Sequence, residues 1–86
     1  MHELSLALEV CRMAEERLPP EHRPRLRTVG VEVGDDAGIE VENFTFCLEA
    51  LLAQPPFGRA RPDVARFADD RLQLSYLEVD DDGPDN

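Results

Sequence analysis

The amino-acid sequence predicts an α+β fold in which a three-stranded mixed sheet carries two helices packed on one face, in the order α-β-α-β-β. Two segments with apolar residues at helical spacing, each followed by a pair of prolines, predict the helices. One cleanly alternating segment and two later segments around an Asp-Asp-Arg turn predict the strands. A chain of 86 residues has room for one domain, which we expect over residues 1–80, with an acidic flexible tail over residues 81–86.

The first helix is predicted over residues 4–18, where apolar residues form one stripe and charged residues fill most other positions. Pro19 and Pro20 end it, because proline donates no backbone hydrogen bond and restricts the residue before it. We expect a loop over residues 21–24. The stripe consists of Leu4, Ala7, Leu8, Cys11, Ala14 and Leu18.

The alternating segment covers residues 26–33. It places three valines on one face and Gly30 and Glu32 on the other, as in a strand that is covered on one side. The long connection that follows permits a right-handed parallel crossover to the next strand.

The second helix is predicted over residues 41–53, between a break rich in glycine and aspartate and the prolines at 55 and 56. Glu40 and Glu42 suit its start, because a carboxylate is stabilised at the positive end of the helix dipole. The residues expected to face inward are Phe44, Leu48, Leu51 and Leu52.

The last two strands are predicted over residues 59–68 and 72–79. The turn between them, Asp69-Asp70-Arg71, predicts a hairpin and therefore an antiparallel pair. Pro62 indicates that the earlier strand lies at an edge of the sheet. The apolar positions change phase near Tyr76, which predicts a bulge there.

The chain is strongly acidic, with nineteen Asp and Glu, nine Arg and no Lys, and its net charge is −10. Such a surface repels phosphate groups, so neither nucleic acid nor an anionic membrane is an expected partner. No apolar run approaches the roughly 18 residues of a membrane span, and the start lacks the layout of a signal peptide. These features predict a cytoplasmic protein.

Cys11 and Cys47 are the two cysteines of the sequence, and no CxxC pair is present. This excludes a zinc site of four cysteines and a disulfide framework. Both fall on apolar helix faces, where free cysteine usually packs as a small hydrophobic residue. No Ser-His-acid arrangement or glycine-rich phosphate loop is evident, so the sequence does not predict an enzyme.

The first three residues offer four nitrogens that can converge on one metal ion. These are the terminal amine of Met1, the backbone nitrogen and imidazole of His2, and the backbone nitrogen of Glu3. A planar set of nitrogens suits Ni(II) or Cu(II), and the first amides of a helix have no partner within it. The alternative is a surface histidine without a metal role, since the positive end of a helix disfavours a cation. Both interpretations stay open on spacing alone.

Residues 1–7, Met-His-Glu-Leu-Ser-Leu-Ala, resemble the start of the HypA/HybF family of hydrogenase nickel-insertion proteins. The similarity continues through residues 31–34, 38–40 and 44–49, which resemble the strand, glycine turn and second helix of the family. Residues 72–79 resemble its closing strand. The opening seven residues are the specific part of this resemblance.

The resemblance implies delivery of nickel to the large subunit of a [NiFe] hydrogenase, with a HypB-like GTPase as a maturation partner. It also implies that Met1, His2 and Glu3 bind Ni(II) transiently. Glu40 aligns with an acidic position of the family and is a further candidate ligand.

One feature departs from the family pattern. Family members carry a zinc module with two CxxC pairs between the last two strands, and only residues 68–71 stand there in this chain. We therefore predict a nickel domain without structural zinc. Two functions stay open, a reduced metallochaperone and a metal-free docking factor that binds the large subunit or another maturation protein. The intact Met1-His2-Glu3 start favours the first, and no oligomeric state is predicted.

Overall fold

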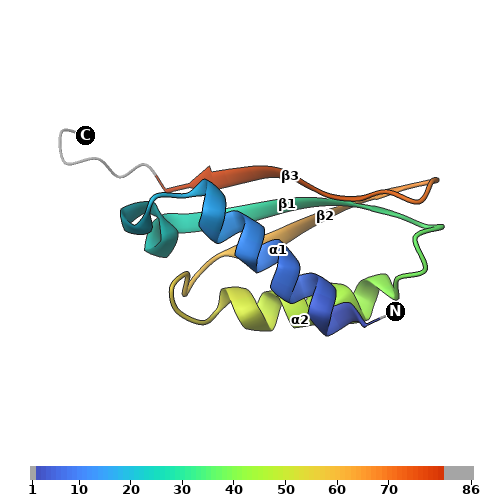
Figure 1. Cartoon of the computed structure of the whole chain (residues 1–86), viewed down its shortest axis with the longest axis horizontal. Coiled ribbons are helices and arrows are strands. Elements are labelled where there is room, and N and C mark those ends of the chain that lie inside the picture. Colours follow the sequence, from blue (N-terminus) through green and yellow to red (C-terminus); the bar gives the residue numbers. More distant parts are fainter. Residues whose placement is uncertain (1, 81–86) are drawn as a thin grey trace.

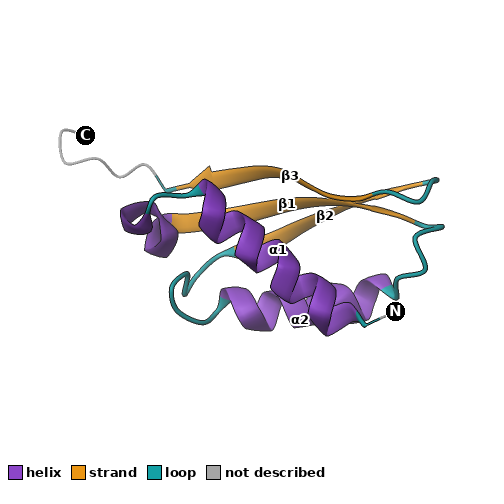
Figure 2. Cartoon of the chain, viewed as in Figure 1, coloured by secondary structure: helices purple, strands orange, loops and turns teal. Residues whose placement is uncertain are grey.

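Two helices lie on one face of a three-stranded sheet (Figures 1 and 2). The computed structural model describes residues 2–80, so Met1 and the tail expected over residues 81–86 lie outside the described residues. The predicted α+β class is confirmed. The elements in chain order are α1 (Glu3–Arg17), the 3-10 helix η1 (Pro20–Arg25), β1 (Leu26–Gly34), α2 (Val41–Leu52), β2 (Arg61–Phe67) and β3 (Leu72–Val79).

β1 is the central strand, and the sheet order is β2-β1-β3. β1 pairs in parallel with β2 and antiparallel with β3, so the predicted mixed sheet is confirmed. The predicted hairpin is wrong, because β2 and β3 lie on opposite sides of β1 and do not pair with each other.

The short connection from β2 to β3 bonds to the end of β1 instead of closing a hairpin. The Gly34 amide donates to the Arg71 carbonyl at 2.7 Å, and the Asp35 amide donates to the Phe67 carbonyl at 2.7 Å. A Cβ atom on Gly34 would lie 1.9 Å from the Asp69 carbonyl oxygen, so glycine is required for this close approach. Residues 68–71 therefore satisfy backbone groups of the central strand.

Two predictions about the outer strands are confirmed. β2, which contains Pro62, is an edge strand. In β3 the register shifts, so that Tyr76 is opposite Gly30 while Leu74 is opposite Val31, which leaves Ser75 as the extra residue of a bulge. The Tyr76 ring lies over Gly30, where an added Cβ would come within 2.1 Å of it.

The core lies between the sheet and the two helices. The three valines of β1 are fully buried, as the alternating pattern predicts, and Leu51 is partly buried against the core. Small residues on α1 let the helix approach closely, since Ala7 and Ala14 are both fully buried. The largest fully buried side chains are Phe44, Leu26, Leu48, Leu52, Val29, Val31 and Val33.

Cys11 and Cys47 are free thiols that are partly buried and pack against the core, as predicted. Burial, with the nearby Glu15 carboxylate as the second cause, raises the pKa of Cys11 to about 11. The Cys11 thiol therefore stays protonated at neutral pH and behaves as a packing group.

The loop predicted over residues 21–24 is instead part of η1. Its Arg23 side chain donates from Nη2 to the Glu15 carbonyl at 2.8 Å and from Nε to the Leu18 carbonyl at 3.2 Å. These carbonyls lie at the carboxyl end of α1, where the Glu15 carbonyl otherwise accepts only a long bond of 3.4 Å from the Leu18 amide, so Arg23 supplies further donors.

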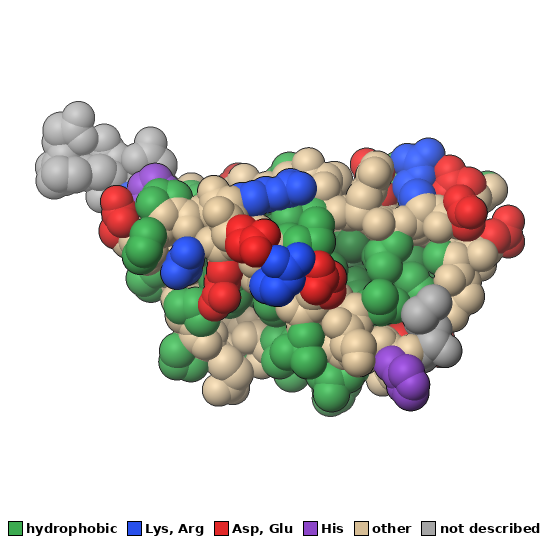
Figure 3. Space-filling view, in the orientation of Figure 1, with side chains coloured by type: hydrophobic (Ala, Val, Ile, Leu, Met, Phe, Trp, Pro, Cys, Tyr) green, Lys and Arg blue, Asp and Glu red, His purple; other side chains and the backbone are tan. Residues whose placement is uncertain are grey.

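The exposed side of α1 combines charged and apolar groups. Arg12 forms ion pairs with Glu9 and Glu16 one turn away on either side, whereas Leu4 and Leu8 are about half exposed. In the space-filling view, acidic and basic side chains alternate over the middle of α1, and hydrophobic patches surround them (Figure 3). No helix within residues 2–80 is long and apolar enough to cross a membrane.

Candidate metal centre

His2 lies directly before α1 as its N-cap residue, with an extended backbone (φ −91°, ψ 96°). Its side chain is exposed and makes no capping hydrogen bond, while its carbonyl accepts the first helical bond from the Leu6 amide at 3.2 Å. The first amides of a helix have no acceptor within the helix. Within residues 2–80 the His2 imidazole forms no hydrogen bond or ion pair, and its exposure makes it accessible to a ligand.

The Glu3 carboxylate joins the start of α1 to the start of α2. Its Oε2 accepts from the Glu40 amide at 3.0 Å, and its Oε1 accepts from Asn43 Nδ2 at 3.3 Å. Both oxygens are thus engaged by groups 37 and 40 positions later in the chain. This contact brings Glu3 and Glu40, two of the candidate residues, together.

Glu40 is the N-cap residue of α2. Its Oε1 accepts from the Asn43 amide at 2.8 Å, and its carbonyl accepts from the Phe44 amide at 2.9 Å. An acidic side chain in this position satisfies an unpaired helical amide and is favoured by the helix dipole. Within residues 2–80, Glu40 Oε2 accepts no hydrogen bond, so one carboxylate oxygen remains open to solvent.

The hydrogen bonds to Glu3 hold the pKa of its carboxyl below the usual value, chiefly because the Glu40 amide donates to the carboxylate. Its own amide and the Asn43 side chain act in the same direction, and desolvation opposes them. Glu3 is therefore ionised at neutral pH and places a negative charge beside the first turn of α1. That charge opposes the repulsion of a cation by the helix dipole.

The candidate side chains do not form a complete metal cluster by themselves. In the described part of the chain, no three or more His, Cys, Asp or Glu side chains gather in a way that could hold a metal ion. Met1 lies outside the described residues. The ligand set of Met1, His2 and Glu3 stays a prediction, and it depends on main-chain nitrogens more than on side chains.

Asn43 is the residue that the sequence analysis missed. Its backbone amide donates to the Glu40 side chain and its side-chain amide donates to Glu3, so it bridges both acidic residues. The available signal was its place three residues after Glu40, the position whose amide an N-cap side chain reaches.

Comparison with known proteins identifies a family model described as hydrogenase/urease nickel incorporation, metallochaperone, hypA, which matches residues 1–68. A hydrogenase maturation factor HypA from Albidiferax ferrireducens is 37% identical over 77 residues, which are 90% of this chain and 59% of that protein. The corresponding factor from Azotobacter vinelandii is 39% identical over 51 residues, 59% of this chain and 45% of that protein. The chain thus spans about half the length of the curated relatives it matches.

Among solved structures, the chain resembles the solution structure of the Ni metallochaperone HypA from Helicobacter pylori. The TM-score is 0.72 at 14% identity, covering 92% of this chain and 97% of that chain. At this identity the likeness shows a shared fold.

Proposed function

Because this chain belongs to the HypA family, we propose that it binds Ni(II) at its amino terminus and delivers the ion to the large subunit of a [NiFe] hydrogenase. Nickel is its cargo, and the role requires no catalysis. The observation that carries the proposal is the amino-terminal site, which we define as His2, Glu3, Glu40 and Asn43. There the exposed His2 side chain directly precedes Glu3, whose ionised carboxylate joins the starts of two helices.

We infer that the ligands are the Met1 amine, the His2 backbone nitrogen and imidazole, and the Glu3 backbone nitrogen. Four nitrogens in a plane suit Ni(II) better than Zn(II), which prefers a tetrahedral set. The open Oε2 atom of Glu40 supports a further, weaker contact from α2. The Glu3 carboxylate is not a ligand in this proposal, since its two oxygens already accept hydrogen bonds from α2 and the residue before it. It contributes a negative charge near the metal.

We further propose that a HypB-like GTPase takes part in the transfer, and that the protein acts in the cytoplasm. The relatives in this family are hydrogenase maturation factors, which supports the choice of hydrogenase as the recipient.

We also propose that the domain folds without structural zinc. The sequence contains no CxxC pair, and residues 68–71 are bonded to the end of β1. Because this connection already satisfies its backbone groups within the sheet, the fold does not need a metal at this point.

A metal-free docking factor is the second candidate. The observation that favours it is the lack of a preassembled cluster of ligating side chains within residues 2–80. Such a factor would bind the hydrogenase large subunit or another maturation protein through the same surface, without carrying nickel.

Calorimetric titration of nickel tests the proposal. The protein with its native start is expected to bind one Ni(II), and affinity should fall at acidic pH, because protons compete with the metal for amine and imidazole nitrogens. His2→Ala, and a chain extended by one residue before Met1, should lose this binding. His22→Ala is the matched control, because it removes the other histidine from η1 and leaves the amino terminus intact.

Equal nickel binding by all four proteins would refute the site, and no binding by any of them would favour the docking factor. Treatment with a strong chelator should leave the melting temperature unchanged. A large decrease would show a structural metal.

A further inference from the structure

Three arginines gather at the end of the sheet opposite to the amino-terminal site. Arg27 is near the start of β1, Arg61 is the first residue of β2, and Arg59 precedes it by two positions. All three side chains are exposed. Because β1 and β2 are parallel, both strands start at the same end of the molecule, away from the starts of α1 and α2 (Figure 1). We call these residues the arginine cluster.

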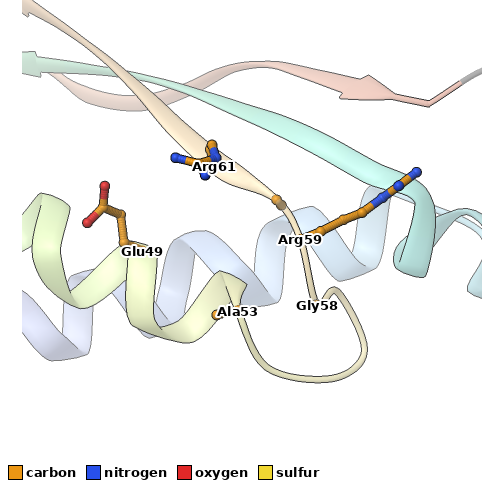
Figure 4. A pocket seen from close by; sticks show the side chains of 6 residues that line it. Glu49, Ala53, Gly58, Arg59 and Arg61 are labelled. Carbon is orange, nitrogen blue, oxygen red and sulfur yellow. The ribbon is translucent and has the colours of Figure 1, made fainter.

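The arginine cluster lines two adjoining pockets of about 450 and 460 Å³, which share Arg59 and Arg61. The first pocket is completed by Glu49 of α2, which faces the strand that carries the arginines (Figure 4), and by Ala53, which directly follows α2. Arg27 and Asp80 complete the second. The two pockets form a continuous recess along the start of the edge strand.

The charges of this recess are not balanced. Asp80 forms an ion pair with Arg59 and lies 3.9 Å from Arg27, whereas Arg61 has neither a hydrogen bond nor an ion pair among the described residues. Glu49 lies across the recess and forms no ion pair with Arg61 within the same part of the chain. Among the described residues that line the recess, three arginines face two carboxylates, so positive charge is in excess there on a chain whose net charge is −10.

Asp80 shows which chemistry the arginine cluster accepts. Its carboxylate already bonds to Arg59, and its carbonyl accepts from Arg25 Nη2 at 2.7 Å. A guanidinium group matches a carboxylate with two parallel hydrogen bonds, and no group within residues 2–80 occupies the side-chain donors of Arg61. The ligand that fits is a chain segment with consecutive acidic side chains.

We propose that the arginine cluster is a docking site for an acidic segment of a partner protein, whose carboxylates bind Arg61 and Arg59. The length of β1 separates this site from the amino-terminal site by more than about 20 Å. A partner can therefore bind the arginine cluster while the first residues remain open. The proposal does not depend on nickel.

Fluorescence anisotropy with a labelled oligo-glutamate peptide tests this docking site in the full chain without metal. The peptide should bind weakly and in a salt-dependent way, with affinity falling at least about tenfold between low salt and 0.5 M NaCl. Arg61→Glu should abolish binding, and its melting temperature should be unchanged because the exposed Arg61 side chain forms no hydrogen bond or ion pair within residues 2–80. Arg66→Glu is the matched control, since it reverses one charge at the far end of the same strand, where Arg66 pairs with Asp35.

Three results would overturn the proposal. Equal loss of peptide binding in Arg61→Glu and Arg66→Glu would show that net charge alone attracts the peptide. Binding of inorganic phosphate but not of the peptide would assign the arginines to phosphate chemistry. Peptide binding that is seen only after Asp81→Asn and Asp82→Asn would identify the carboxylates of this chain as the occupants.

Discussion

The amino-terminal site and the arginine cluster lie at opposite ends of the molecule and use their charged side chains differently. At the amino-terminal site the carboxylates of Glu3 and Glu40 accept hydrogen bonds from the start of α2, so their charge holds two helices together. At the arginine cluster one carboxylate serves Arg59 and lies near Arg27, and Arg61 stays unpaired within residues 2–80.

This difference in pairing indicates which groups are available to bind a ligand at each site. Both oxygens of Glu3 and one oxygen of Glu40 already accept hydrogen bonds, so a ligand of the amino-terminal site depends mainly on His2 and main-chain nitrogens. The Arg61 guanidinium forms no hydrogen bond or ion pair within residues 2–80, so it can bind a partner without breaking a contact of this kind. If this comparison is correct, substitutions at one end should change binding there and leave the other end intact.

The largest effect should come from the core that holds both ends in place. Phe44 is fully buried, and Phe44→Ala should destabilise the protein by about 3 to 5 kcal/mol, because it removes a large side chain and leaves a cavity. Chemical denaturation measures this loss, and nickel and peptide binding should weaken together. Phe46→Ala is the matched control on the same helix, since Phe46 is 69% exposed and its removal should change stability by less than about 0.5 kcal/mol. Similar losses for both variants would contradict the assigned packing of α2.

A smaller effect should separate the two ends. Glu40→Ala removes the N-cap of α2 and should cost about 1 kcal/mol. Asn43→Ala keeps the backbone amide that donates to the Glu40 side chain and loses only the side-chain bond to Glu3, so its cost should be about 0.5 kcal/mol. Both variants should weaken nickel binding in calorimetry and leave binding of the oligo-glutamate peptide unchanged. A parallel loss of peptide binding would mean that the ends are coupled.

The smallest effect should be a dependence of stability on pH that originates at Glu3. The pKa of Glu3 is lower in the folded protein than its ordinary value of 4.5, so the ionised carboxylate favours folding above that pH. This contribution should disappear as the pH falls through the lower, folded pKa. Below pH 5, the free energy of unfolding should therefore decrease less steeply with falling pH for Glu3→Gln than for the unchanged protein. Chemical denaturation at several pH values measures this. Glu42→Gln is the matched control, because Glu42 is exposed in the first turn of α2. It should leave the dependence of the unfolding free energy on pH unaltered.

Most of the fold follows from local patterns. Helical spacing, strand alternation and proline stops predict the helices and strands within about two residues, because each pattern reflects which face is buried. The position of β2 and β3 on opposite sides of β1 does not follow from local patterns. A polar turn such as residues 69–71 suits a hairpin as well as a connection that bonds to a third strand. The available signal for this arrangement was the pair of glycines in β1, because Gly30 and Gly34 each allow another segment to pass close to the central strand.

The candidate site was predictable in its residues and not in its contacts. The resemblance indicated His2, Glu3 and Glu40, but the bond between Glu3 and the Glu40 amide depends on how α1 and α2 pack. The contact of Asn43 with Glu3 joins residues 40 positions apart, so no local sequence pattern predicts it. The arginine cluster was also missed, because its members come from β1 and from the start of β2 and meet only in the sheet.

The central position of β1 has a consequence for how the protein folds during synthesis. Every pairing of the sheet joins distant residues, with Thr28 opposite Arg61, Val33 opposite Leu72 and Leu26 opposite Val79. This high contact order makes sheet assembly slow, because long loops have to close before any strand pair forms. β1 leaves the ribosome well before either neighbour exists, and its valines and both edges are then unprotected. We therefore expect β1 to be the part of the nascent chain that chaperones recognise.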